Sequence, residues 1–114
     1  PTYVAELKNG EIFEYQISPE DFGIPLQSTD TIQAFDASES LALIKTALEG
    51  KGKVNPARDI VALNAGAAIY VSGIADTLAE GVNIAEDVIG GGTAKVKMSE
   101  LASFTRCFMS PDSL

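Results

Sequence analysis

Histidine is absent from this sequence. The side chains that remain as first candidates for chemistry are carboxylates, lysines and one thiol. Without histidine there is no Ser-His or Cys-His nucleophile pair, no imidazole base and no imidazole metal ligand. Cys107 is the single cysteine, which excludes an internal disulfide and an all-cysteine zinc site. With no histidine to activate its thiol, we expect Cys107 to be a bystander near the end of a helix.

Two pairs of adjacent acids, Glu20-Asp21 and Glu86-Asp87, are the candidates for acid–base or metal chemistry. Such chemistry needs carboxylates that converge on one point, whereas neighbours on a helix point about 100° apart. We therefore expect Glu86-Asp87 to be solvated and Glu20-Asp21 to help cap a loop. Asp21-Phe22-Gly23 also matches the magnesium-binding tripeptide of protein kinases, but the sequence lacks the other motifs of that site. A loop with a buried Phe22 is the favoured interpretation.

Two features could meet an anion. Gly90-Gly91-Gly92-Thr93 is rich in glycine, yet a helix rather than a strand is expected before it, which favours a connector between helices. Four cations surround one connection between helices: Lys45, Lys51, Lys53 and Arg58. The dipole of a helix favours cations near its C-terminus in any case, so a ligand role for this group stays open.

Asn64 is the polar residue within the apolar stretch 60–71. We expect it to be buried, where an amide without hydrogen-bond partners costs about 1–3 kcal/mol. A bond to neighbouring backbone is favoured over contact with a ligand, although the sequence leaves both open.

Pro1 raises a different class of enzyme, because a free N-terminal proline amine can act as a base. Tautomerases of about this length begin with proline and a strand, but they continue with a helix and a parallel strand. A Pro1-dependent tautomerase is therefore the weaker alternative. Since no initiator methionine precedes Pro1, we expect the chain to have been processed, trimmed or cut from something longer.

The elements that must position these residues are one hairpin and about four helices. Alternating β-prone residues on both sides of Asn9-Gly10, a strong two-residue turn signal, predict a β-hairpin over residues 2–16. Apolar spacing, capping residues and glycines predict helices at about 38–49, 56–72, 77–89 and 93–105. The expected N-caps are Ser28 or Thr29 for a short turn, Asp36 or Ser38, Asn55 followed by Pro56, and Asp76. Gly50 and Gly52 are expected to end the first helix.

Composition and charge narrow the class of protein to which this chain can belong. A chain of 114 residues that is 46% hydrophobic and 21% charged is expected to form one globular core. Its formal charge of -8 argues against a nucleic-acid binder. The stretch 60–71 is too short to span a bilayer and no secretory signal is evident, so we expect no membrane partner and a cytoplasmic location.

A hairpin alone is marginally stable, and a helix that is apolar all round must be covered on most sides. We therefore expect an α+β fragment of a larger α/β domain. Taken in order, five segments resemble the C-terminal portion of the anthranilate phosphoribosyltransferase family: PTYVAEL at 1–7, NGEI at 9–12 with Tyr15, PEDFGI at 19–24, VALNAGAAIYVSG at 61–73, and LAEGV at 78–82. The resemblance continues through Ala85, Gly92, Ala94 and Leu101, and it covers about residues 1–105.

The resemblance implies a magnesium-dependent transferase of tryptophan biosynthesis, which moves phosphoribosyl from phosphoribosyl pyrophosphate to anthranilate. It also implies a homodimeric parent and a larger fold shared with nucleoside phosphorylases. The family's glycine-rich phosphate loop, its Lys-His-Gly-Asn segment and its magnesium-binding Asp-Glu pair lie upstream of the matching stretch. We therefore assign no catalytic, substrate-binding or metal residue here, and we expect this chain alone to be inactive and to bind no magnesium.

The expected binding partners follow from the interpretation of this chain as part of a larger domain. We expect the remainder of the parent chain to be one partner, and self-association through the hairpin or the 60–71 helix to be another. A stand-alone helical interaction module is the main alternative.

Overall fold

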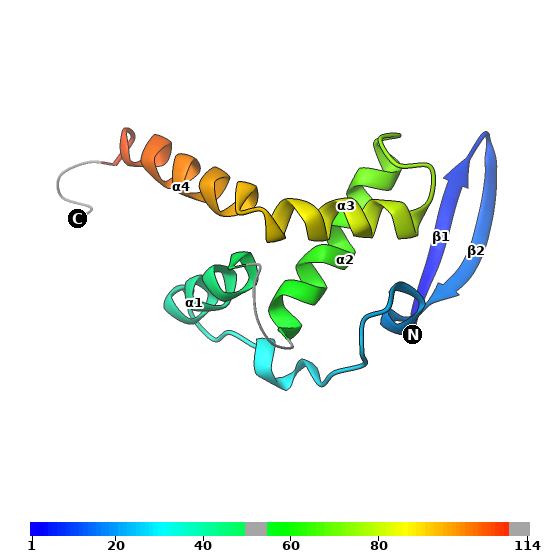
Figure 1. Ribbon diagram of the computed structural model, residues 1–114, viewed down its shortest axis with the longest axis horizontal. Helices are drawn as coiled ribbons and strands as arrows, with labels where there is room; N and C mark the ends of the chain where they lie inside the picture. Colours follow the sequence, from blue (N-terminus) through cyan, green and yellow to red (C-terminus); the bar gives the residue numbers. More distant parts are fainter. Residues whose placement is uncertain (50–54, 110–114) are drawn as a thin grey trace.

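The computed structural model describes residues 1–49 and 55–109. It has an antiparallel hairpin followed by four α-helices, which confirms the α+β class expected from the sequence. The elements in chain order are β1 Thr2–Lys8, β2 Glu11–Ile17, the 3-10 turns η1 Pro19–Phe22 and η2 Thr29–Ile32, and the helices α1 Ala37–Leu48, α2 Pro56–Val71, α3 Leu78–Gly90 and α4 Thr93–Arg106. Figure 1 shows the hairpin at one end of an elongated molecule, with α2 and α3 crossing in the middle.

The hairpin turns at Asn9-Gly10, as predicted. Both residues have positive φ, 52° and 79°, which suits a two-residue turn between twisted strands. Lys8 pairs with Glu11 directly beside the turn, so the register follows from it. Residues alternate between two faces, and the half-buried residues of the inner face are Val4, Glu6, Tyr15 and Ile17. The large apolar residues of the exposed outer face are Tyr3, Leu7 and Ile12.

Side chains begin the helices much as the sequence indicated. The Asp36 carboxylate accepts a hydrogen bond from the Glu39 amide at 2.8 Å, and the Asn55 side chain accepts one from the Arg58 amide at 3.0 Å. Ser28 likewise caps η2. α1 ends at Leu48, and the predicted stops Gly50 and Gly52 lie outside the described residues.

The prediction that Asp76 caps the third helix is wrong. Thr77 is the N-cap of α3, and its hydroxyl accepts a hydrogen bond from the Glu80 amide at 3.1 Å. Asp76 lies one residue too early, and its own amide donates to the Glu80 carboxylate at 3.2 Å. Because both residue types make good caps, the spacing to the first free amide decides between them.

The core lies where α2 crosses α3 through two glycines. A Cβ built on Gly81 would lie 2.3 Å from the Gly66 carbonyl oxygen, so the helices touch backbone to backbone. Small and branched residues fill the space around this crossing: Ala62, Val82, Ala85 and Ile89, each at most 3% exposed. The close approach follows from the lack of side chains at both positions.

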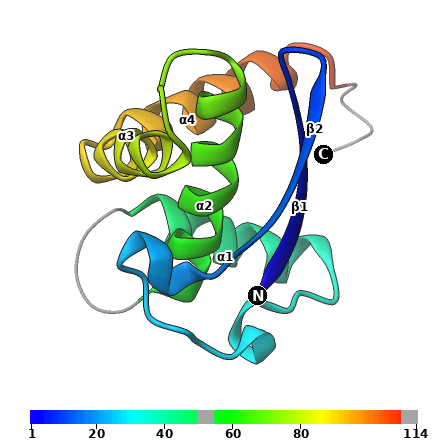
Figure 2. The same cartoon turned by 90° about the vertical axis from the view of Figure 1, so that its right-hand side faces the viewer.

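Much apolar surface outside the crossing stays exposed. Three α2 side chains that we expected to be covered are open to solvent: Ile60, Val61 and Val71, the last at 79%. α4 leaves the body of the molecule and buries none of its residues (Figures 1 and 2). Within the described ranges, no helix is both long and apolar enough to cross a bilayer.

Candidate functional site: a groove between the hairpin and α2

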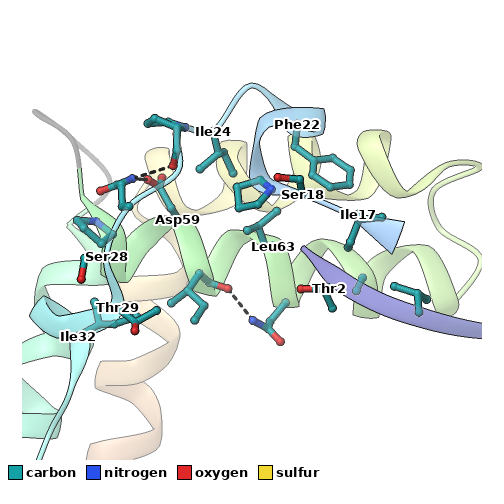
Figure 3. Close-up of a pocket in the computed structure, with 18 residues that line it drawn as sticks. Thr2, Ile17, Ser18, Phe22, Ile24, Ser28, Thr29, Ile32, Asp59 and Leu63 are labelled. Carbon is teal, nitrogen blue, oxygen red and sulfur yellow. Dashed lines mark hydrogen bonds between the residues drawn. The ribbon is translucent and has the colours of Figure 1, made fainter. Parts of the chain in front are cut away.

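An apolar groove of about 460 Å³ lies between the base of the hairpin, the loop that follows it, and α2. Three segments line it: β1 and β2 contribute Val4 and Ile17, the loop contributes Phe22 and Ile24, and α2 contributes Leu63. Figure 3 shows Ile17, Phe22 and Leu63 around the open space. Apolar contacts hold the loop, since Ile24 is 6% exposed and Phe22 is half-buried. The loop at Phe22 is as expected, but its side chain is only half-buried and not buried.

The acid that lines the groove, Asp59, is already occupied. Its Oδ2 accepts a hydrogen bond of 2.8 Å from the Gln27 side-chain amide (Figure 3). Its Oδ1 lies 4.0 Å from the Arg58 Nε. The Gln27 bond ties the loop to the first turn of α2. Asp59 therefore acts as a structural link, and among residues 1–49 and 55–109 no second carboxylate lines the groove to form an acid–base pair.

Asn64 lines the groove but is exposed, so our expectation that it is buried is wrong. Its Nδ2 donates 2.8 Å to the Ile60 carbonyl one turn earlier in α2. The favoured backbone partner is therefore present, within the same helix. The exposure arises because the groove leaves this side of α2 uncovered.

A polar cluster joins the hairpin to α2 above the groove. The Tyr15 hydroxyl donates to Glu6 Oε1 at 2.8 Å, and the Tyr70 hydroxyl donates to Glu6 Oε2 at 2.6 Å. These hydrogen bonds, with Lys8 as a lesser influence, hold the pKa of Glu6 below its usual range. Glu6 raises the pKa of Tyr15 to about 12, and it also raises the pKa of Tyr70. We call this set of three residues the Glu6 cluster.

Sequence reasoning missed the Glu6 cluster. The available signal was the position of Glu6 on the inner face of the hairpin, the face that it shares with Val4 and Tyr15. A charged residue at an inward position needs partners. The partner Tyr70 comes from 64 residues further along the chain.

The adjacent acids behave as expected. Asp21 Oδ2 accepts a hydrogen bond of 2.8 Å from the Ser18 amide, so this acid caps η1. Glu86 and Asp87 are both exposed on α3. The kinase-like tripeptide is thus a capped turn whose glycine, Gly23, has a φ of 73°.

The described residues of the two anion candidates are not among those that line the groove. Gly91 and Gly92 connect α3 to α4, and Gly92 has a φ of 83°, which fits the predicted connector. Lys45 is exposed on α1 and Arg58 faces Asp59, whereas Lys51 and Lys53 lie outside the described residues. An anion site at this group stays a prediction.

Cys107 is exposed at the end of α4, where its thiol donates 3.7 Å to the Ser103 carbonyl. This is the bystander position that we expected. Among the described residues, no group of three or more cysteine and acidic side chains converges to hold a metal ion. Those residues therefore do not fit a magnesium site.

Comparison with known proteins places this arrangement in a family. Residues 1–95 match the glycosyl transferase family, a/b domain. The chain belongs to this family. It is 93% identical over its whole length to an anthranilate phosphoribosyltransferase of Marinomonas sp. (strain MWYL1), of which it covers 33%. It is also 54% identical over 98% of its length to the enzyme of that name from Chromohalobacter salexigens, and 56% identical over 94% to that from Marinobacter nauticus, covering 32% of each.

These matches confirm the resemblance drawn from the ordered segments. The chain spans about a third of the length of the curated relatives it matches. Neither alternative finds support, since the first strand of this chain leads into a hairpin and not into the helix of a tautomerase. The groove and the exposed apolar faces are thus features of one part of a family member.

Proposed function

We propose that this chain serves as part of an anthranilate phosphoribosyltransferase that moves phosphoribosyl from phosphoribosyl pyrophosphate to anthranilate. The observation that carries the proposal is 93% identity along the entire chain to a protein of that name. The place of this reaction is tryptophan biosynthesis in the cytoplasm.

The role we propose for this part is to pack, not to touch the reacting atoms. In such a transfer, pyrophosphate leaves as positive charge develops on the ribosyl carbon, and the anthranilate amine attacks. Catalysis then rests on positioning and on neutralising the leaving phosphates, a task suited to magnesium. Asp59, Asp21 and Glu6 each accept a hydrogen bond from another residue of this chain, which supports a structural role for these three carboxylates.

The partner for packing is the remainder of the transferase chain. Strands covered on both faces carry apolar residues on both, and this hairpin has Val4 and Ile17 inside with Leu7 and Ile12 outside. Leu7 and Ile12 are 74% and 71% exposed, which supports a covering layer from another segment. The groove beside α2 offers a second apolar surface against which that remainder can pack.

When that remainder is absent, we propose that the same faces join copies of this chain. Exposed apolar patches of this kind favour association. In the whole enzyme we propose a homodimer.

A chimera tests the function. In the Marinomonas protein, the third that matches this chain is replaced by this sequence, and consumption of anthranilate with phosphoribosyl pyrophosphate and magnesium is followed. We expect activity close to that of the unmodified protein. The matched control carries Val82→Asp, which places a charge at a position only 1% exposed and should abolish folding and activity.

The isolated 114-residue chain is assayed in parallel and should give no turnover. An inactive chimera that is correctly folded would contradict the assignment to this enzyme. Steady transfer by the isolated chain would instead contradict the proposed packing role.

A further inference from the structure

The hairpin is joined to α2 by one acidic side chain that bonds to both. Glu6 lies on β1, Tyr15 on β2 and Tyr70 near the end of α2. The bond from Tyr15 stays within the hairpin, whereas the bond from Tyr70 crosses to the helices at 2.6 Å. Figure 2 shows the hairpin in front of the helices when the molecule is viewed from that end.

The charge on Glu6 matters because an ionised acceptor makes hydrogen bonds roughly twice as strong as a neutral one. A carboxylate can accept hydrogen bonds from both hydroxyls at once, one on each oxygen, as the two distances show. A protonated carboxyl loses that charge assistance. In the part of the chain that the structure describes, the further charged group that faces the cluster is Lys8 of β1, whose Nζ lies 5.9 Å from the centre of the Tyr70 ring.

We propose that the Glu6 cluster is a charge-dependent latch, in which the ionised Glu6 carboxylate holds the β-hairpin against α2 and releases it when the carboxylate gains a proton. A two-stranded hairpin is marginal without a surface to lie on, so release also loosens its strand pairing. The groove opens with it, because Val4 and Ile17 of the hairpin form one of its walls. The α2–α3 crossing does not include the hairpin and stays intact.

The titration follows from the lowered pKa of Glu6. A carboxyl whose folded pKa is depressed stabilises docking fully above its unfolded pKa. That stabilisation is lost as the pH falls through the folded value. Docking is therefore complete at neutral pH and is lost in acid. This behaviour does not depend on the proposed enzymatic function.

Amide hydrogen exchange of the 114-residue chain, compared between β1–β2 and α3, tests the latch. As the pH is lowered through the titration of Glu6, protection of the strand amides should fall by about tenfold relative to α3. In Glu6→Gln, which keeps the shape and removes the charge, strand protection should be low at every pH. Glu14→Gln is the matched control, because Glu14 is exposed and lies on the outer face.

Two tyrosine variants separate a latch from a merely stabilising contact. Tyr70→Phe removes the bond that crosses to α2, whereas Tyr15→Phe removes the bond within the hairpin. We expect Tyr70→Phe to lower strand protection and to leave α3 unchanged, and Tyr15→Phe to have the smaller effect on docking. Ring-carbon NMR signals of Tyr15 and Tyr70 should share one acid midpoint, with the exposed Tyr3 as reference.

Three outcomes would overturn the latch. They are unchanged strand protection in Tyr70→Phe, an acid transition that persists in Glu6→Gln, and an equal loss of protection in Glu14→Gln. If Glu6→Gln unfolds the helices as well, Tyr70→Phe and Tyr15→Phe still test the latch. Equal losses of strand protection in these two variants would overturn the proposal.

Discussion

Replacing Gly81 by alanine tests whether the core depends on backbone contact between α2 and α3. The new Cβ would lie 2.3 Å from the Gly66 carbonyl oxygen and 3.2 Å from its carbonyl carbon. Carbon–oxygen contacts in proteins begin at about 3.3 Å. The overlap with the oxygen is therefore about 1 Å, and helix backbone cannot rotate away from it. The two helices must separate.

Two effects of opposite sign set the change in the free energy of unfolding that Gly81→Ala causes. Alanine favours a helix over glycine by about 1 kcal/mol. Overpacking of a close core costs about 1–3 kcal/mol and occasionally more. The cost should lie at the upper end, because Val82 and Ala85 beside Gly81 are 1% and 2% exposed and lose contacts as the gap opens. We expect the free energy of unfolding to fall by about 2 kcal/mol.

Urea and thermal unfolding, followed by helical circular dichroism, measure this change, and the unfolding midpoint should drop by roughly 10 °C. Gly91→Ala is the matched control, because Gly91 has an ordinary φ of -79° and its Cβ would meet Asp87 oxygen at 3.3 Å. We expect Gly91→Ala to change the free energy of unfolding by less than about 0.5 kcal/mol. A Gly81→Ala chain as stable as the parent, or a Gly91→Ala chain equally weakened, would refute the reasoning.

Two further predictions concern pH and association. Because the pKa of Tyr15 is raised to about 12, its phenol stays neutral in the folded chain where an unfolded tyrosine ionises, so the free energy of unfolding should decline as the pH rises from about 10 through 12. Urea unfolding at stepped alkaline pH checks this, and a flat profile that does not change in Tyr15→Phe would contradict it. Light scattering should show a molar mass that rises with concentration, and Leu7→Lys on the outer hairpin face should reduce the rise. A monomer at every concentration would count against self-association.

Local signals predicted the hairpin and the helix boundaries well, because each depends on neighbours in the chain. Asn9-Gly10 can adopt positive φ at both positions, and this alone sets the turn and the register. Asn55-Pro56 likewise begins α2 as expected. The prediction of Asp76 as a cap failed because Thr77, an equally good capping residue, follows it directly, and residue type cannot rank the two.

The candidate site could be predicted only in part. The turn with a partly buried Phe22 and the capping role of Asp21 follow from residues within a few positions of each other. The groove does not, since its walls come from the hairpin, the loop and α2. The exposure of Asn64 is decided by what covers α2 and was therefore out of reach.

The sequence by itself determined the secondary-structure elements and the family resemblance. It also excluded the kinds of chemistry that need histidine or paired cysteines. Each of these depends only on residue types or on their order along the chain. The tertiary structure alone decided which residues meet across long separations. Glu6 reaches Tyr70 over 64 residues, and Gly66 meets Gly81 at a crossing that spacing within one helix does not specify. Periodicity shows which residues share a face, but the partner of that face is set by packing of the whole chain.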